Sequence, residues 1–209
     1  MKKISYSIFA VLACFMASCS KLASTDNAPS TTAVAAKGSF YPAIAVKDRL
    51  PSSVSHVDKH GFPSYAVKDR KRYVRTTAYS DQENEPGAEG NLNAAGTTLK
   101  YGRVRSAAAD WSIYPLGTTF KIKGLPHTYV VDDYGSALVG TNTIDIYHPK
   151  LSLMCKWGTR PVEISIIKMG DWERTATLLK GRVKYRHCAQ MYAGVMKNLL
   201  QRKATAKND

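Results

Sequence analysis

From Tyr73 onward, short β-prone runs alternate with Gly, Pro and Asn positions that favour turns. Runs of this length and spacing are typical of a small barrel or sandwich. The pattern therefore predicts a mainly β domain with strands at 73–79, 99–104, 118–122, 128–131, 143–147 and 162–168.

Two helices are expected at the edges of this domain. Residues 149–157 begin with Pro149, which suits a first helical turn, and are followed by Gly158, which suits a helix end. Residues 188–200 place apolar side chains on one helical face. We predict a domain at 73–171 with short peripheral helices. A basic C-terminal extension at 172–209, which contains the second helix, follows it.

The N-terminus has the pattern of an export signal. Lys2 and Lys3 precede a largely apolar run at 4–16 that is too short for a permanent membrane span. Residues 16–19, Met-Ala-Ser-Cys, resemble the lipobox of bacterial lipoproteins, which implies cleavage after residue 18 and lipidation of Cys19. The alternative is an ordinary signal peptide with a bystander cysteine. In a Gram-negative host, Ser20 in place of aspartate favours the outer membrane facing the periplasm.

The segment between signal and domain is divided by composition. Residues 19–39 are rich in small and polar side chains and predict a flexible tether, because they cannot bury enough surface to offset chain entropy. Residues 40–72 predict an extended lead-in. The pentapeptide Ala-Val-Lys-Asp-Arg occurs in it twice, at 45–49 and 66–70, too few copies for a solenoid.

Net charge limits the classes of binding partner, and cysteine usage bears on disulfide formation. The formal net charge is +14, and loss of residues 1–18 with their two lysines leaves +12. An exported basic protein meets envelope polyanions, not nucleic acid, although a solvated basic surface is an equal alternative. After processing, Cys155 and Cys188 remain in an oxidising compartment and predict a disulfide, with two buried free thiols as the alternative.

The order of motifs between residues 76 and 168 carries a family resemblance. Ala78-Tyr79 is followed by Asp110, by Ile-Tyr-Pro-Leu-Gly-Thr at 113–118, by 133–140, by Ile-Asp-Ile-Tyr at 144–147 and by Trp157-Gly158. This order resembles the 3D domain, named for three aspartates, of the lytic transglycosylase A family and of stationary-phase cell-wall proteins. The resemblance covers about 90 residues and implies a six-stranded double-psi β-barrel.

Several positions depart from that pattern. Trp111 stands where proline is usual, Ser136 replaces a glycine and Val139 replaces a lysine. The interval from Asp133 to Asp145 is also one residue longer than expected. The presence of all three aspartates favours catalysis, whereas the lost lysine and the longer interval favour binding without cleavage.

The resemblance implies that Asp145, Asp133 and Asp110 are catalytic, with Asp145 as the acid/base. Alternation within 143–147 places Ile144 and Ile146 on one face and Asp145 on the other. Burial in a groove would raise its pKa and suit it to protonate a glycosidic oxygen. The alternatives are a solvated carboxylate at 145 and turn-capping carboxylates at 133 and 110. Asp132 is expected to point outward.

Tyr79, Thr97, Tyr134, Gly135 and Tyr147 are the predicted substrate-binding residues, although aromatic residues in small barrels are as often core. The histidines are not spaced as metal ligands, so no metal or other cofactor is expected. No Gly-rich phosphate loop and no serine or cysteine nucleophile motif is present in the sequence.

The predicted function is a peptidoglycan-cleaving lipoprotein, a murein lytic transglycosylase that forms 1,6-anhydro ends, with a hydrolase of the same bond as a variant. The alternatives are a non-catalytic, expansin-like peptidoglycan-binding lipoprotein and a structural envelope lipoprotein, since fold alone does not fix function. The expected partners are peptidoglycan glycan strands and a membrane reached through the lipid anchor, with no nucleic acid and a monomeric chain.

Overall fold

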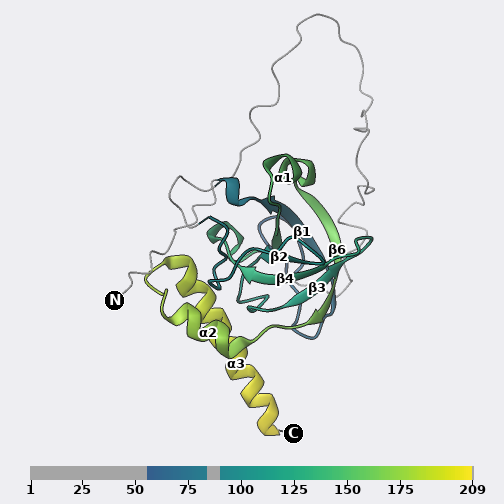
Figure 1. The fold of residues 1–209 in the computed structure, drawn as a ribbon. Coiled ribbons are helices and arrows are strands. Elements are labelled where there is room, and N and C mark those ends of the chain that lie inside the picture. The colour runs from purple at the N-terminus through teal and green to yellow at the C-terminus, as the bar shows by residue number, and fades with distance from the viewer. Residues whose placement is uncertain (1–55, 84–89, 209) are drawn as a thin grey trace, which may run out of the picture.

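Six strands form a closed barrel in a computed structural model that describes residues 56–83 and 90–208 (Figure 1). Around the barrel the strands follow the order β1-β5-β2-β4-β3-β6, and β6 pairs with β1 to close it. The pairs β1–β5 and β2–β4 are parallel and the others are antiparallel. The strands are β1 (Lys71–Tyr79), β2 (Val104–Ala108), β3 (Thr119–Ile122), β4 (Thr128–Asp133), β5 (Thr143–Tyr147) and β6 (Arg160–Lys168).

The predicted mainly β architecture is therefore confirmed, and five of the six predicted strands coincide with observed ones. The prediction of a strand at 99–104 is wrong. That segment is a turn, in which Gly102 N–H donates to the Val104 carbonyl and Tyr101 forms a single bridge with Arg105. The strand begins only at Val104.

Alternation along the strands builds the core. Inward-facing side chains such as Val74, Ala107, Val131, Ile144 and Ile146 are fully buried and belong to one apolar cluster. That cluster continues into the helices at the C-terminal end of the chain. The barrel and these helices therefore share one core.

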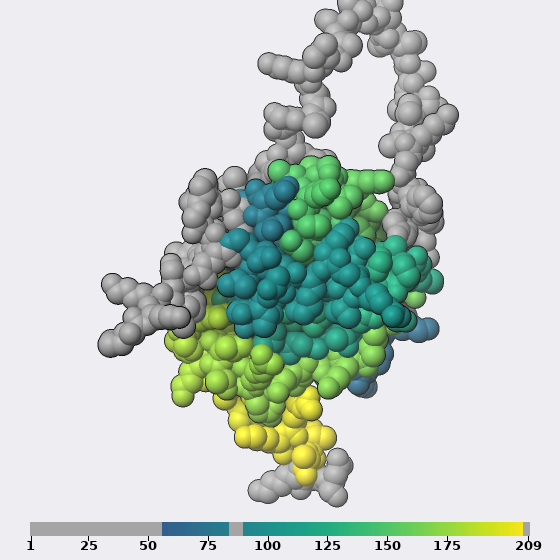
Figure 2. Space-filling view, in the orientation of Figure 1, coloured from purple at the N-terminus to yellow at the C-terminus, as the bar shows by residue number. Residues whose placement is uncertain are grey.

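The helices lie at two ends of the barrel. Figures 1 and 2 show α1 (Leu151–Trp157) at one end, and α2 (Trp172–Lys180) and α3 (Arg186–Asn208) at the opposite end. Gly158 ends α1 with a φ of 60°, as a left-handed glycine often does. The Asp171 side chain caps α2 by accepting from the backbone N–H of Arg174. None of the helices in the described residues is both long and apolar enough to span a bilayer.

Residues 56–70 of the predicted lead-in lie against the barrel. The carboxylate of Asp58 accepts from the N–H groups of His60 and Phe62, and also from that of Asn142, which directly precedes β5. In the second Ala-Val-Lys-Asp-Arg copy, the Asp69 carboxylate accepts from the Ala66 N–H. The first copy, the tether at 19–39 and the signal at 1–18 with Cys19 lie outside the described residues.

The predicted disulfide is absent, and the alternative of two buried free thiols holds for Cys188 but not for Cys155. Cys155 is exposed on α1, whereas Cys188 is buried on α3. The two cysteines lie on helices at opposite ends of the barrel (Figure 1), so a covalent bridge does not fit their placement. Only Cys188 is buried, so one of the two thiols meets solvent.

Candidate functional site

Strand register brings Asp145 and Asp133 to the same level of the sheet. Thr77 on β1 pairs with Asp145 on β5, Asp145 pairs with Ala108 on β2, and Ala108 pairs with Asp133 on β4. Paired residues share a face of a sheet, so this row is opposite to the core face that holds Ile144 and Ile146. We call these four residues the carboxylate row.

Asp145 is a buried carboxyl with one close donor. The Thr77 hydroxyl donates to its Oδ1 at 2.7 Å, and the residue is only 6 % exposed. Burial raises the pKa of Asp145 to about 7, the charge of Glu83 acts in the same direction, and the Thr77 bond and Arg75 oppose the rise. The group therefore exchanges its proton near neutral pH, which general acid–base chemistry requires.

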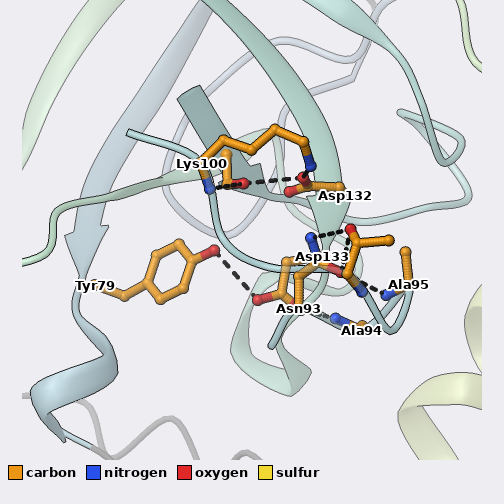
Figure 3. A network of polar contacts seen from close by, with 9 residues as sticks. Tyr79, Asn93, Ala94, Ala95, Lys100, Asp132 and Asp133 are labelled. Carbon is orange, nitrogen blue, oxygen red and sulfur yellow. Dashed lines mark hydrogen bonds and ion pairs between the residues drawn. The ribbon is translucent and has the colours of Figure 1, made fainter. Parts of the chain in front are cut away.

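Asp133 is held more tightly by its neighbours (Figure 3). Its Oδ1 accepts from the backbone N–H groups of Ala94 and Tyr134, and its Oδ2 accepts from the Tyr79 hydroxyl at 3.2 Å. Burial raises the pKa of Asp133 to about 7 despite these bonds, with a contribution from the charge of Asp132. Asp133 is thus a second proton-exchanging group on the row.

Tyr79 connects the two carboxyls electrostatically. Its pKa is held well above the usual value by burial and by the charges of Asp133, Asp132 and Asp145. The hydroxyl remains protonated and acts as a hydrogen-bond donor. Its ring lies 5.6 Å from that of Tyr147, with centroids as the reference points.

Asp132, which is expected to be an outward-facing neighbour, is buried. The register shifts between Ala107 and Ala108, so Asp132 is the extra residue of a bulge. Asp132 is 4 % exposed, and its Oδ2 accepts from Lys100 Nζ at 2.7 Å and from Ser106 Oγ at 2.9 Å. Burial still raises its pKa.

Asp110 serves a different purpose. Its Oδ1 accepts from the backbone N–H and hydroxyl of Ser112, and its Oδ2 accepts from the Gly140 N–H at 2.7 Å. Within 56–83 and 90–208, no hydrogen bond joins Asp110 to Asp133 or Asp145. The turn-capping alternative describes Asp110, although burial raises its pKa as well.

The predicted substrate-binding residues lie in three separate places. Tyr79 and Tyr147 flank the carboxylate row, and the Tyr147 hydroxyl donates to Asp81. Thr97 is exposed in a loop, where it bonds Asn93.

Tyr134 and Gly135 lie in the third place, directly after β4. The Tyr134 ring packs edge-on against Trp111 at 4.8 Å, and its hydroxyl contacts Cys188 of α3. Gly135 is buried before η3 (Ser136–Leu138). The Tyr134 side chain therefore packs toward the C-terminal helices, away from Asp145.

Three residues near the row were missed from the sequence. Thr77 is identified only by its pairing with Asp145, and Lys100 lies in the turn that was misread as a strand. His148 directly follows Tyr147, and its N–H donates to the Tyr79 carbonyl. Among the described residues, no group of three or more His, Cys, Asp or Glu side chains is arranged to hold a metal ion.

Comparison with known proteins gives two similarities over this part of the chain. Residues 105–168 match the model of the 3D domain family, and this range includes most of β2, all of β3 to β6, and Asp110, Asp133 and Asp145. The chain is also 33% identical over 95 residues to "Putative cell wall shaping protein YabE" of Bacillus subtilis (strain 168). That similarity covers 45% of this chain and only 22% of the relative. Residues 105–168 are therefore similar to the 3D domain family.

Proposed function

We propose that this protein cleaves the glycan strands of peptidoglycan between MurNAc and GlcNAc. The match of residues 105–168 to the 3D family and the similarity to a protein named for cell wall shaping support a peptidoglycan-related role. The finer assignment rests on one observation, the buried Asp145 carboxyl whose pKa is raised to about 7 beside Thr77. The closed six-stranded order with two parallel pairs also supports the double-psi topology.

In the proposed mechanism, Asp145 acts first as an acid. Its proton passes to the glycosidic oxygen while the bond to C1 of the muramyl residue breaks, and the GlcNAc end leaves as an alcohol. Asp145, now a carboxylate, then takes the proton of the muramyl 6-hydroxyl as that oxygen bonds to C1. The product is a 1,6-anhydro ring, no water is consumed, and Asp145 regains its proton.

Asp133 and Tyr79 support this chemistry from the other side of the row. The Tyr79 hydroxyl donates its one proton to Asp133 at 3.2 Å, so Tyr79 holds the Asp133 carboxyl in place beside Asp145. Asp133 is assigned to positioning, because both of its oxygens accept from protein groups.

The experiment is incubation of the full chain with purified sacculi, followed by mass analysis of the released fragments. The expected products are anhydro-muropeptides, which are absent with Asp145→Asn. Asn keeps an oxygen to accept from Thr77 and removes only the exchangeable proton. Release of fragments that carry an added water would indicate the hydrolase variant, and undiminished release by Asp145→Asn would exclude the mechanism.

A non-catalytic peptidoglycan-binding role is the second candidate. The observation that favours it is the burial of Asp133 and Asp145, which are 2 % and 6 % exposed. Such small exposed fractions limit the contact of either carboxyl with a glycosidic oxygen. In the same experiment, intact sacculi carrying bound protein would support this candidate.

The proposed location is the outer membrane facing the periplasm, with Cys19 carrying the lipid. Metabolic labelling with a radioactive fatty acid should mark the chain, and Cys19→Ala should abolish the label. A labelled Cys19→Ala variant would show that Cys19 is not the anchor.

A further inference from the structure

A second polar cluster adjoins the carboxylate row at the end of β5. Around His148, three nearly or fully buried side-chain nitrogens have no hydrogen-bond partner in the described part of the chain. They are Arg105 Nε, His148 Nε2 and Trp157 Nε1. Buried polar groups without partners are rare, and each needs an explanation such as a ligand or water.

Ring contacts hold the three side chains together. The His148 ring lies 5.6 Å from the Trp157 ring and 5.5 Å from the Tyr101 ring, with centroids as reference points. The Arg105 guanidinium stacks over Tyr101 at 4.1 Å. His148 is 5 % exposed, whereas Tyr101 and Arg105 are half-buried and face outward.

The protonation state makes all three nitrogens donors. Burial, followed by the charges of Arg105 and Arg160, lowers the pKa of His148 to about 4, so its ring is neutral at pH 7. The Tyr101 hydroxyl lies 3.2 Å from Nδ1, and when it donates there the proton of the ring is on Nε2. Indole and guanidinium nitrogens are donors only, so the cluster suits a ligand that is anionic and accepts several hydrogen bonds.

We propose that Arg105, His148 and Trp157 form a subsite for a carboxylate of the peptide stem carried by the glycan strand. This inference rests on the proposed function. A planar carboxylate matches an arginine fork and neighbouring N–H donors. The subsite is continuous with the row, because the His148 N–H bonds the Tyr79 carbonyl at 2.9 Å and Tyr101 packs edge-on against Tyr147 at 6.3 Å.

The test measures binding to the full chain carrying Asp145→Asn, which leaves the glycan uncut. The probes are a glycan fragment with its peptide stem and the same fragment with the stem removed by an amidase. We expect the peptide-bearing fragment to bind about tenfold more tightly. Arg105→Gln should remove this preference, and Arg103→Gln, an exposed arginine two residues away, should keep it.

A second readout follows the Trp157 indole N–H by nuclear magnetic resonance. Its signal should move with the peptide-bearing fragment and stay fixed with the stripped one. A response to inorganic phosphate and not to the peptide-bearing fragment would overturn the proposal. Equal binding of both fragments would remove the subsite alone, whereas binding of neither would end the proposed function as well.

Discussion

The carboxyl groups of Asp133 and Asp145 keep their protons for a common physical reason. Both lie on the outer face of the barrel and are almost fully covered, so the charged form loses more hydration than its hydrogen bonds return. Thr77 and Tyr79 lower the cost without abolishing it. This balance predicts a distinct pH dependence of stability.

Asp145→Asn should stabilise the protein at pH 8 and have little effect at pH 4. The folded pKa of about 7 lies above the ordinary 3.8, so the stability that Asp145 contributes is present below pH 3.8 and lost as the pH rises through 7. The difference amounts to up to about 4 kcal/mol above pH 7. Denaturant unfolding of both proteins at the two pH values measures it.

Glu173→Gln, at an exposed position on α2, is the matched control and should differ from the parent by a similar small amount at both pH values. An Asp145→Asn effect of equal size at pH 4 and pH 8 would contradict burial as the cause of the raised pKa.

Asp110 contributes stability in a different manner. Asp110→Ala removes the acceptor for the N–H groups of Ser112 and Gly140 and should cost about 2–4 kcal/mol in the free energy of unfolding. The activity of the remaining folded molecules should persist, because no hydrogen bond among the described residues joins Asp110 to the row. Chemical denaturation and sacculus digestion at low temperature measure the two effects.

Asp110→Asn keeps one acceptor oxygen and should fall between the parent and Asp110→Ala in stability. A well-folded Asp110→Asn variant that released no anhydro-muropeptides would instead assign Asp110 to the chemistry.

At the scale of elements, the local sequence pattern predicts most of the strands but not all of them. The strand 143–147 is predicted at its observed bounds because alternation and β-branched residues agree there. The misread 99–104 segment shows the opposite, since Leu99 and Val104 fit a strand while Gly102 forms a turn. The sequence analysis does not predict α2, although Asp171, which caps its N-terminus, is a residue type typical of a helix start.

Gly170 determines how α2 joins the barrel, and Gly170→Ala should destabilise it by about 3 kcal/mol. An added Cβ would lie 2.2 Å from the Leu116 carbonyl oxygen and 2.3 Å from that of Pro115. Both are backbone atoms, and the Leu116 carbonyl is also held by a hydrogen bond from the Asp171 N–H. Thermal and denaturant unfolding measure the loss.

The control is Gly102→Ala, where a Cβ would meet nothing within 4 Å and the change should stay within about 0.5 kcal/mol. Equal stability of the two variants would mean that the 115–118 turn moves away from residue 170 at little cost.

For the whole molecule, sequence motifs name candidate residues but do not predict which of them lie together. Asp133 and Asp145 are twelve residues apart along the chain, and only the register through Ala108 places them on one row. Asp110 has the same motif support but is drawn into a local turn. Motifs identify residue types, whereas long-range pairing decides which side chains share a surface.

The C-terminal helices are part of the same core, which leads to the last prediction. Trp172, Leu179, Met191 and Val195 are buried with Trp111 in one cluster, and the Trp111 N–H contacts the Met191 sulfur. Each such side chain contributes about 2 kcal/mol when buried, so removing 172–209 cancels most of the 5–15 kcal/mol typical of a domain. A chain of residues 56–171 should therefore lack a cooperative thermal transition, whereas residues 56–209 should keep one. Near-ultraviolet circular dichroism, which reports the packing of Trp111, follows both chains. A cooperative transition in the shorter chain within a few degrees of the longer one would mean that the barrel is stable alone and that the helices are an addition to it.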